Sequence, residues 1–170
     1  DATVCLFIGS DYQPNVVAAE HVMRFACELP SVEFVIIGTV GNSLKSREVP
    51  DNVIITGYVE DDFEAHFDLT DIALNPMTKG GGTNIKLIDY FARSLPVVST
   101  PFGVRGMEVT DGEEIVVAEI NDFVDRICSL SVNIKRRLKL GTKARSVATN
   151  RYTWEAASNQ LHSACTDLVE

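Results

Sequence analysis

The residues best suited to chemistry are three consecutive glycines, Gly80, Gly81 and Gly82, which separate an apolar stretch from a helical pattern. Glycine lets the backbone adopt positive φ and approach a ligand closely. A helix that begins directly after such a loop, here expected over residues 83–93, offers unpaired N–H groups and a partial positive charge. Lys86 adds a full positive charge near its start. Together these features predict a site for an anion such as phosphate, although a flexible surface loop has the same composition.

Three charged residues follow on the expected helix. Lys86, Asp89 and Arg93 are three and four positions apart and therefore share one helical face. Asp89 can form ion pairs with its two basic neighbours, or its carboxylate can accept hydrogen bonds from ribose hydroxyl groups. The residues alone favour neither interpretation.

Several other kinds of site are not indicated by the sequence. The glycines are not followed by the Gly-Lys-Ser/Thr of a P-loop, and no Gly-x-Gly-x-x-Gly follows the first apolar run, which argues against a nicotinamide or flavin site. The three histidines are scattered, and the acidic clusters are more typical of helix caps and turns than of a metal site. The sequence therefore predicts neither a metal ion nor a cofactor, and it identifies no catalytic residue.

The scaffold for these residues is predicted from short apolar runs that alternate with helical patterns. The expected strands cover residues 3–8, 33–37, 53–56, 71–74, 96–99 and 114–118. The expected helices cover residues 15–29, 61–69 and 83–93, and three more fill the remainder of the chain, the last within residues 151–170. Apolar strands separated by helices indicate an α/β fold with a doubly wound, mainly parallel, Rossmann-like sheet of about six strands and helices on both faces. Ligands of such sheets bind at the carboxyl ends of the strands, where the glycines lie.

The composition limits the class of protein. A chain of 170 residues with 45% hydrophobic and 23% charged residues is typical of one globular domain. The net charge of −9 argues against nucleic-acid binding. No apolar run is long enough to span a bilayer. The four cysteines lack metal-ligand spacing and are expected to be buried, reduced thiols of a cytoplasmic protein.

Two helical segments near the end of the chain are expected to be structural and not part of the site. The basic run over residues 135–145 is expected to be a solvated helix face, with docking to anionic membrane lipid as the alternative. A core stripe is expected at the helical spacing of Trp154, Ala157, Leu161, Ala164 and Leu168.

Eight segments together resemble one family of enzymes. They are residues 7–10, 14–15, 36–38, 53–59, 75–76, 80–89, 95–100 and 151–154. In order and spacing they resemble the C-terminal, donor-binding domain of a retaining GT-B glycosyltransferase of family 4, the glycosyl transferases group 1. The resemblance covers nearly the whole chain, whose first expected strand begins at residue 3. It therefore implies a single nucleotide-sugar-binding domain over residues 1–170, without the N-terminal acceptor domain.

The resemblance also implies an activity. Such an enzyme, of hexosyltransferase type, moves a sugar from a UDP- or GDP-type nucleotide-diphosphate sugar to a glycan or lipid-linked acceptor in polysaccharide biosynthesis. It implies a cytoplasmic protein that is at most peripheral to the inner face of the membrane, and little or no transfer by the isolated domain.

The resemblance further assigns roles to residues. In relatives the base lies against the loop after the third strand, the ribose meets the acidic group at Asp89, and the diphosphate meets the glycine loop. The residues expected to bind the donor are Gly9, Ser10, Gly38, Tyr58, Val59, Gly80, Gly81, Gly82, Thr83, Asn84, Lys86, Asp89 and Arg105.

The chain departs from the family pattern in two places. Gly81 stands where many relatives carry the first of two glutamates, and Asp89 stands in place of the second. The first loop, residues 10–13, lacks the basic residue that many relatives use for the diphosphate, so Arg105 either substitutes for it or is a surface residue. The alternatives are a non-catalytic, degenerate nucleotide-binding module and, more remotely, a phosphorylase-like site whose lysine holds pyridoxal phosphate.

Overall fold

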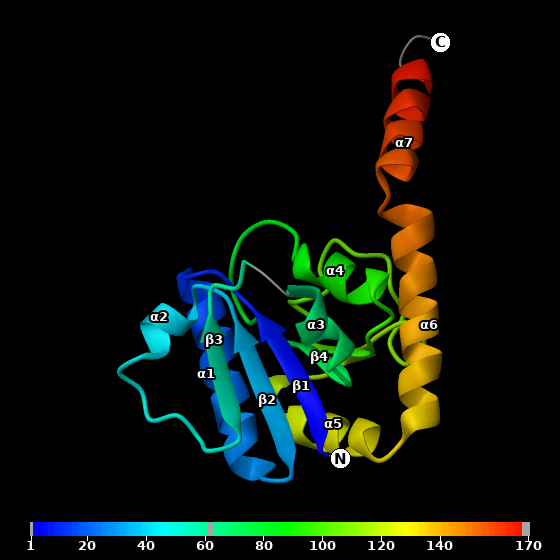
Figure 1. Cartoon of the computed structure of the whole chain (residues 1–170). Helices are drawn as coiled ribbons and strands as arrows, with labels where there is room; N and C mark the ends of the chain where they lie inside the picture. Colours follow the sequence, from blue (N-terminus) through cyan, green and yellow to red (C-terminus); the bar gives the residue numbers. More distant parts are fainter. Residues whose placement is uncertain (1, 61–62, 168–170) are drawn as a thin grey trace.

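The computed structural model describes residues 2–60 and 63–167 and has a six-stranded parallel sheet at its centre (Figure 1). The strands are β1 (Thr3–Ile8), β2 (Val32–Ile37), β3 (Val53–Gly57), β4 (Ile72–Asn75), β5 (Val97–Ser99) and β6 (Val116–Val117). Their spatial order is β3-β2-β1-β4-β5-β6, and each neighbouring pair is parallel. The order reverses where β1 meets β4, and this is the point at which open α/β sheets bind ligands. The predicted fold class is confirmed.

Helices cover both faces of this sheet. They are α1 (Gln13–Glu28), α2 (Gly41–Leu44), α3 (Phe63–Asp68), α4 (Lys86–Ala92), α5 (Phe123–Ser131), α6 (Ile134–Arg151) and α7 (Trp154–Asp167), with a 3₁₀ turn η1 at Ile120–Asp122. Successive side chains of β1 point to opposite faces. Cys5 and Phe7 therefore enter the core shared with α1 and α5, whereas Leu6 enters the core shared with α3, α4 and α6.

Several expected helix boundaries were wrong. The helix expected over residues 15–29 begins two residues earlier, at Gln13, and ends at Glu28. The helix expected over residues 83–93 begins only at Lys86, because Gly82 has φ +70° and Ile85 N–H bonds to the Thr83 carbonyl in a tighter turn. The start expected for α3 at residues 61–62 lies outside the described residues. Arg151 still belongs to α6, so the terminal helix is Trp154–Asp167.

The last helix corrects a second expectation. Helices α6 and α7 follow one another along one side of the molecule, and α7 extends beyond the sheet (Figure 1). Trp154 is 94% exposed, so it does not pack in a core stripe. The side chains of Ala157, Leu161, Ala164 and Leu168 lie outside the described side chains.

Other surface features follow the sequence in part. Cys5 is buried, but Cys27, Cys128 and Cys165 are exposed thiols, which contradicts the expected burial. In the basic run, Lys135, Lys139 and Arg145 are exposed as expected. Arg137 is instead half-buried and bonds to Asp71 Oδ1 at 3.1 Å. Across residues 2–60 and 63–167, no helix combines the length and apolar character needed to cross a membrane.

Candidate functional site

Two adjoining cavities open at the carboxyl ends of the strands. The first, called here the glycine-loop cavity, has a volume of about 270 Å³. It is lined by Ile8, Gly9, Ser10, Tyr12, Asn15, Met77, Lys79, Gly80, Gly81, Thr83, Asn84, Ile85, Lys86 and Arg105. The second, called here the β3 cavity, has about 450 Å³ and is lined by Ile8, Gly9, Ser10, Ile37, Gly38, Thr39, Tyr58, Val59 and Glu60. Because Ile8, Gly9 and Ser10 belong to both, an extended ligand can occupy the two together.

The wall between the cavities depends on close backbone contact between the ends of β1 and β2. Gly38 has φ +108°, and a Cβ built on it lies only 2.2 Å from the carbonyl oxygen of Gly9. The Val40 N–H also donates to that carbonyl, at 3.2 Å. A side chain at position 38 would therefore push apart the two turns that both cavities share.

The glycine loop has free amide groups beside the first cavity, which Gly80 and Gly81 line. Gly80 and Gly82 have φ of +130° and +70°, and their carbonyl oxygens both accept hydrogen bonds from Arg105 Nη2, at 3.2 and 2.8 Å. The Arg105 guanidinium also stacks on the Phe102 ring, 3.8 Å from its centroid. In the described part of the chain, the N–H groups of Gly80, Gly81 and Gly82 donate no hydrogen bond. With its carbonyls held by a cation, the loop is suited to bind an anion through its amides.

A buried polar network supports this loop from below. Asn75 at the end of β4 donates to Ser99 Oγ at 2.9 Å and to the Gly103 carbonyl at 3.2 Å. Asn84 Nδ2 donates to the same carbonyl at 2.7 Å, which joins the glycine loop to the loop after β5. The Asn84 side-chain amide therefore has a structural role. Arg105 lines the glycine-loop cavity.

Lys86 lines the glycine-loop cavity and has no acidic partner among the described residues. Its Nζ lies 3.0 Å from Asn15 Oδ1 on α1 and 4.3 Å from the centre of the Phe7 ring. Burial lowers the pKa of Lys86 to about 7. Lys79 and Arg105 line the same cavity, and no Asp or Glu stands among the described residues that line it. The cavity therefore holds an excess of positive charge in a chain whose net charge is −9.

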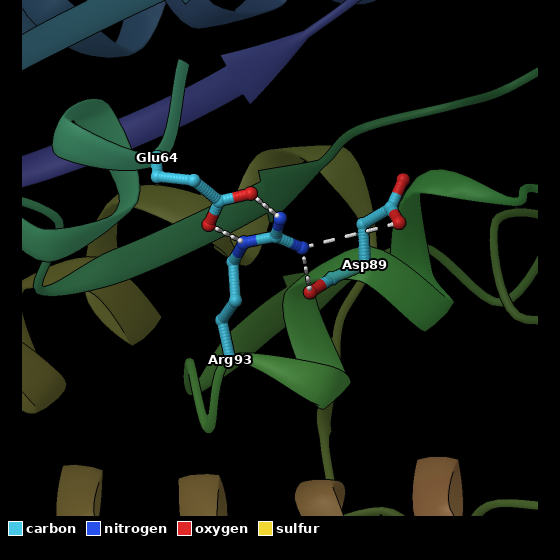
Figure 2. A network of polar contacts seen from close by, with 3 residues as sticks. All are labelled: Glu64, Asp89 and Arg93. Carbon is cyan, nitrogen blue, oxygen red and sulfur yellow. Dashed lines mark hydrogen bonds and ion pairs between the residues drawn. The ribbon is translucent and has the colours of Figure 1, made fainter. Parts of the chain in front are cut away.

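Lys86 and Asp89 lie three positions apart in α4, but no ion pair joins them among the described residues. The Asp89 carboxylate is 4.0 Å from Arg93 Nη1, and the Asp89 side chain is 55% exposed (Figure 2). Burial raises the pKa of Asp89, an effect that Arg93 partly opposes. Glu64 on α3 holds the same Arg93 more closely, at 3.0 Å from its Nε. Of the two ion pairs predicted for Asp89, only the weak one with Arg93 is present.

Most of the predicted site residues converge on these cavities. The glycine-loop cavity includes Gly9, Ser10, Gly80, Gly81, Thr83, Asn84, Lys86 and Arg105. The β3 cavity adds Gly38, Tyr58 and Val59. Gly82 and Asp89 line neither cavity: Gly82 belongs to the loop beside the first, and Asp89 lies one helical turn after Ile85.

Nine lining residues are not among the predicted donor-binding residues. The five of them with polar side chains are Tyr12, Asn15, Thr39, Glu60 and Lys79. Asn15 had a usable signal, because it continues the buried helical spacing of Ala19, Val22 and Ala26. An amide at a core position indicates a buried polar contact, here with Lys86 and Ser10. Lys79 could also have been found, because a cation directly before the three glycines lies next to the predicted anion site.

Among the described residues, no group of three or more His, Cys, Asp or Glu side chains is placed to hold a metal ion.

Comparison with known proteins gives one family and one fold. The family model for glycosyl transferases group 1 matches residues 2–133. A Klebsiella pneumoniae protein described as an uncharacterized 44.6 kDa protein in the cps region is 28% identical over 166 residues, covering 86% of this chain and 42% of that protein.

Solved structures share the fold. Sucrose-phosphate synthase from Thermosynechococcus elongatus superposes with a TM-score of 0.81 at 15% identity, covering 99% of this chain and 46% of that one. Anabaena Alr3699/HepE in complex with UDP superposes with a TM-score of 0.79 at 13% identity, covering 98% of this chain and 49% of that one. The chain thus spans less than half of these three proteins. Because the family model covers more than half of this chain, the chain belongs to the glycosyl transferases group 1 family.

Proposed function

We propose that this chain is the donor-binding domain of a retaining glycosyltransferase of family 4 and binds a nucleotide-diphosphate sugar at the carboxyl edge of its sheet. The observation that carries the proposal is the glycine-loop cavity. Three free backbone amides and the side chains of Lys79, Lys86 and Arg105 surround it or line it. Free amides and cations in one cavity are the groups that bind a diphosphate.

The second cavity provides a place for the base. The diphosphate lies in the glycine-loop cavity, and the nucleoside extends past Gly9 and Ser10 into the β3 cavity beside Tyr58 and Val59. Asp89 accepts hydrogen bonds from the ribose hydroxyl groups. Anabaena HepE, which shares the fold, has been solved with UDP and with UDP-glucose, which supports a UDP-type donor.

The chemistry is the transfer of a hexosyl group to a glycan or lipid-linked acceptor. The bond between the anomeric carbon and the diphosphate oxygen breaks, and negative charge develops on the leaving diphosphate. A bond forms between that carbon and an acceptor hydroxyl oxygen, and the hydroxyl proton passes to the leaving diphosphate. The amides of the glycine loop and the nearby cations stabilise this charge, which lowers the barrier. Gly81 offers no acidic group to the sugar, and its surroundings are open within 4 Å. Contacts to the sugar therefore come from elsewhere in the whole enzyme.

The remaining part of the enzyme is proposed to supply the acceptor side. The chain spans 42% of its Klebsiella relative and 49% of HepE, which leaves room for an N-terminal acceptor domain. Since the site then lies in a cleft between two domains, this chain alone binds nucleotide weakly and transfers little or no sugar. We place the enzyme in the cytoplasm, at most peripheral to the inner face of the membrane.

The test is a calorimetric titration of the chain with UDP, GDP and ADP, alone and as their sugars. Gly82→Asp puts a carboxylate beside the proposed diphosphate and should weaken binding about tenfold or more, since like charges across an interface are costly. Gly112→Asp is the matched control, because Gly112 has φ +77° against +70° at Gly82, and neither has an atom within 4 Å of a built Cβ. Circular dichroism checks that both variants fold.

Three outcomes distinguish the alternatives. Equal binding by the Gly82→Asp and Gly112→Asp variants places the diphosphate elsewhere. If neither this chain nor the full-length protein binds any nucleotide at millimolar concentration, the donor site is refuted. Nucleotide binding with no transfer by the full-length protein supports the non-catalytic module, and a yellow purified protein supports the phosphorylase-like site with pyridoxal phosphate on Lys86.

A further inference from the structure

Arg93 lies between two carboxylates and is held by only one of them (Figure 2). Its Nε donates to Glu64 Oε2 at 3.0 Å, and its Nη2 donates to Glu64 Oε1. Asp89 Oδ1 is 4.0 Å from Nη1, beyond hydrogen-bond distance, although Nη1 does donate to the Asp89 backbone carbonyl at 3.3 Å. Glu64 therefore holds the guanidinium with two bonds, whereas the Asp89 carboxylate accepts none from it.

The pose of Arg93 has a clear physical origin. Bidentate pairing with a carboxylate matches the planar fork of a guanidinium. The Arg93 guanidinium also lies over the Phe67 ring of α3, 4.0 Å from its centroid. Both contacts draw Arg93 toward α3 and away from the Asp89 carboxylate on its own helix α4.

Among the described residues, Asp89 is the one carboxylate besides Glu64 that lies within 4.0 Å of Arg93. An Asp and an Arg four positions apart on a helix form a favourable ion pair. Such a pair would occupy the oxygens of Asp89 with guanidinium N–H groups. In the structure those oxygens accept no side-chain hydrogen bond from the described residues, and the side chain is 55% exposed.

We propose that Glu64 is a positioning residue that holds Arg93 off the Asp89 carboxylate and so keeps that carboxylate free for the ribose hydroxyl groups of the donor. The proposal rests on the proposed function, in which Asp89 meets the ribose. It adds a determinant of ribose recognition from a different helix, 25 positions earlier in the chain. Helix α3 follows the loop that carries Tyr58 and Val59, so the same segment of chain would serve the base and the ribose.

The experiment measures how well the chain discriminates ribose from deoxyribose. UDP and GDP are titrated beside their 2′-deoxy and 3′-deoxy counterparts by calorimetry. The variants are Glu64→Ala, Arg93→Met and the double variant, and Asp89→Asn sets the ratio expected without the carboxylate. Arg93→Met keeps an aliphatic stem over Phe67. Glu20→Ala is the matched control. Glu20 lies on α1 and forms an exposed ion pair with Arg47, in which Glu20 Oε1 and Arg47 Nη2 are 2.5 Å apart.

The expected result is a selective loss that a second substitution reverses. Glu64→Ala should weaken binding of the ribonucleotide about two- to threefold, because the ribose must then displace a helical Asp–Arg pair of modest strength, and leave the deoxynucleotides nearly unchanged. The ribose-to-deoxyribose ratio should then approach that of Asp89→Asn. Adding Arg93→Met should restore the ratio, because the competing guanidinium is gone, and Glu20→Ala should not change it.

Each other outcome overturns the proposal. An unchanged ratio in Glu64→Ala shows that Arg93 does not compete for Asp89. A lowered ratio that the double variant fails to restore shows that Glu64 acts through something other than Arg93. In both cases nucleotide binding by the wild-type chain would still support the proposed function. Absence of nucleotide binding by the wild-type chain and by the full-length protein instead refutes the proposed function and this inference with it.

Discussion

The two halves of the candidate site are held in place by different forces. On the glycine-loop side, buried hydrogen bonds join Asn75, Ser99 and Gly103 beneath the loop, and Lys86 is enclosed between α1 and β1. On the Asp89 side, the contacts are ion pairs at the surface: Glu64 is 72% exposed and Asp89 55%. The glycine-loop side is therefore coupled to the stability of the fold, whereas the Asp89 side can be altered at little cost in folding.

The largest effect is expected at Gly103, beneath the glycine loop. A Cβ built there lies 2.4 Å from Ser99 Oγ and 2.5 Å from Asn75 Nδ2. Gly103→Ala should lower the free energy of unfolding by roughly 3 kcal/mol, at the upper end of overpacking costs, and should weaken nucleotide binding with it. Urea denaturation measures the change.

The control for that prediction is Gly81→Ala, because no atom lies within 4 Å of its built Cβ and its φ is not positive. It should change the free energy of unfolding by less than about 0.5 kcal/mol, as at ordinary surface sites. Equal stability of the Gly81→Ala and Gly103→Ala variants would remove the claimed coupling between the loop and the fold.

The next effect separates binding from stability at Lys86. Lys86→Met keeps an unbranched side chain near Phe7 but removes the charge from the cavity. Affinity for UDP should fall by about 2 kcal/mol, as for a hydrogen bond to a charged group, while the free energy of unfolding is maintained or rises because a costly buried ammonium is gone. Calorimetry and urea denaturation measure the two quantities, and Lys139→Met on the exposed face of α6 is the control.

The contrast also explains what the sequence could predict. Apolar runs such as residues 33–37 determine strands locally, and glycines determine loop conformation locally, so the sheet and the glycine loop were predictable. The contact between Lys86 and Asn15 joins residues 71 positions apart, and that between Glu64 and Arg93 joins residues 29 apart. Helical spacing indicated that Lys86 and Arg93 could pair with Asp89, but in the structure Lys86 bonds to Asn15 and Arg93 bonds to Glu64.

The end of the chain shows the same limit. The spacing of Trp154 was that of a buried stripe, yet its side chain is 94% exposed. Periodicity predicts which residues share a face and does not show whether the rest of the chain covers that face.

The stability of the glycine-loop side should depend on pH through Lys86. The pKa of Lys86 is about 7 in the folded chain, against an ordinary value of 10.5. Between these values the unfolded chain carries one more proton at Lys86, so the free energy of unfolding should rise with pH from 7 to 10.5. Below pH 7 both states are protonated and this contribution is constant.

Diphosphate binding should show the opposite trend. The ligand prefers charged Lys86, so affinity for UDP should fall as pH rises above 7, by at most about tenfold per pH unit for one coupled proton. Comparison with Lys86→Met isolates the effect, since a slope that survives in the variant would assign the proton to another group.

The smallest effect is expected for the stability of Asp89→Asn, on the exposed side. The Asp89 carboxylate is 4.0 Å from its cation and more than half exposed, and such pairs contribute little. The free energy of unfolding should therefore change by less than about 0.5 kcal/mol, while the preference for ribose over deoxyribose is lost. A variant destabilised as strongly as Gly103→Ala would show that the Asp89 side is also coupled to the fold. Loss of ribose preference at unchanged stability would instead mean that the surface carboxylate is retained for the ligand.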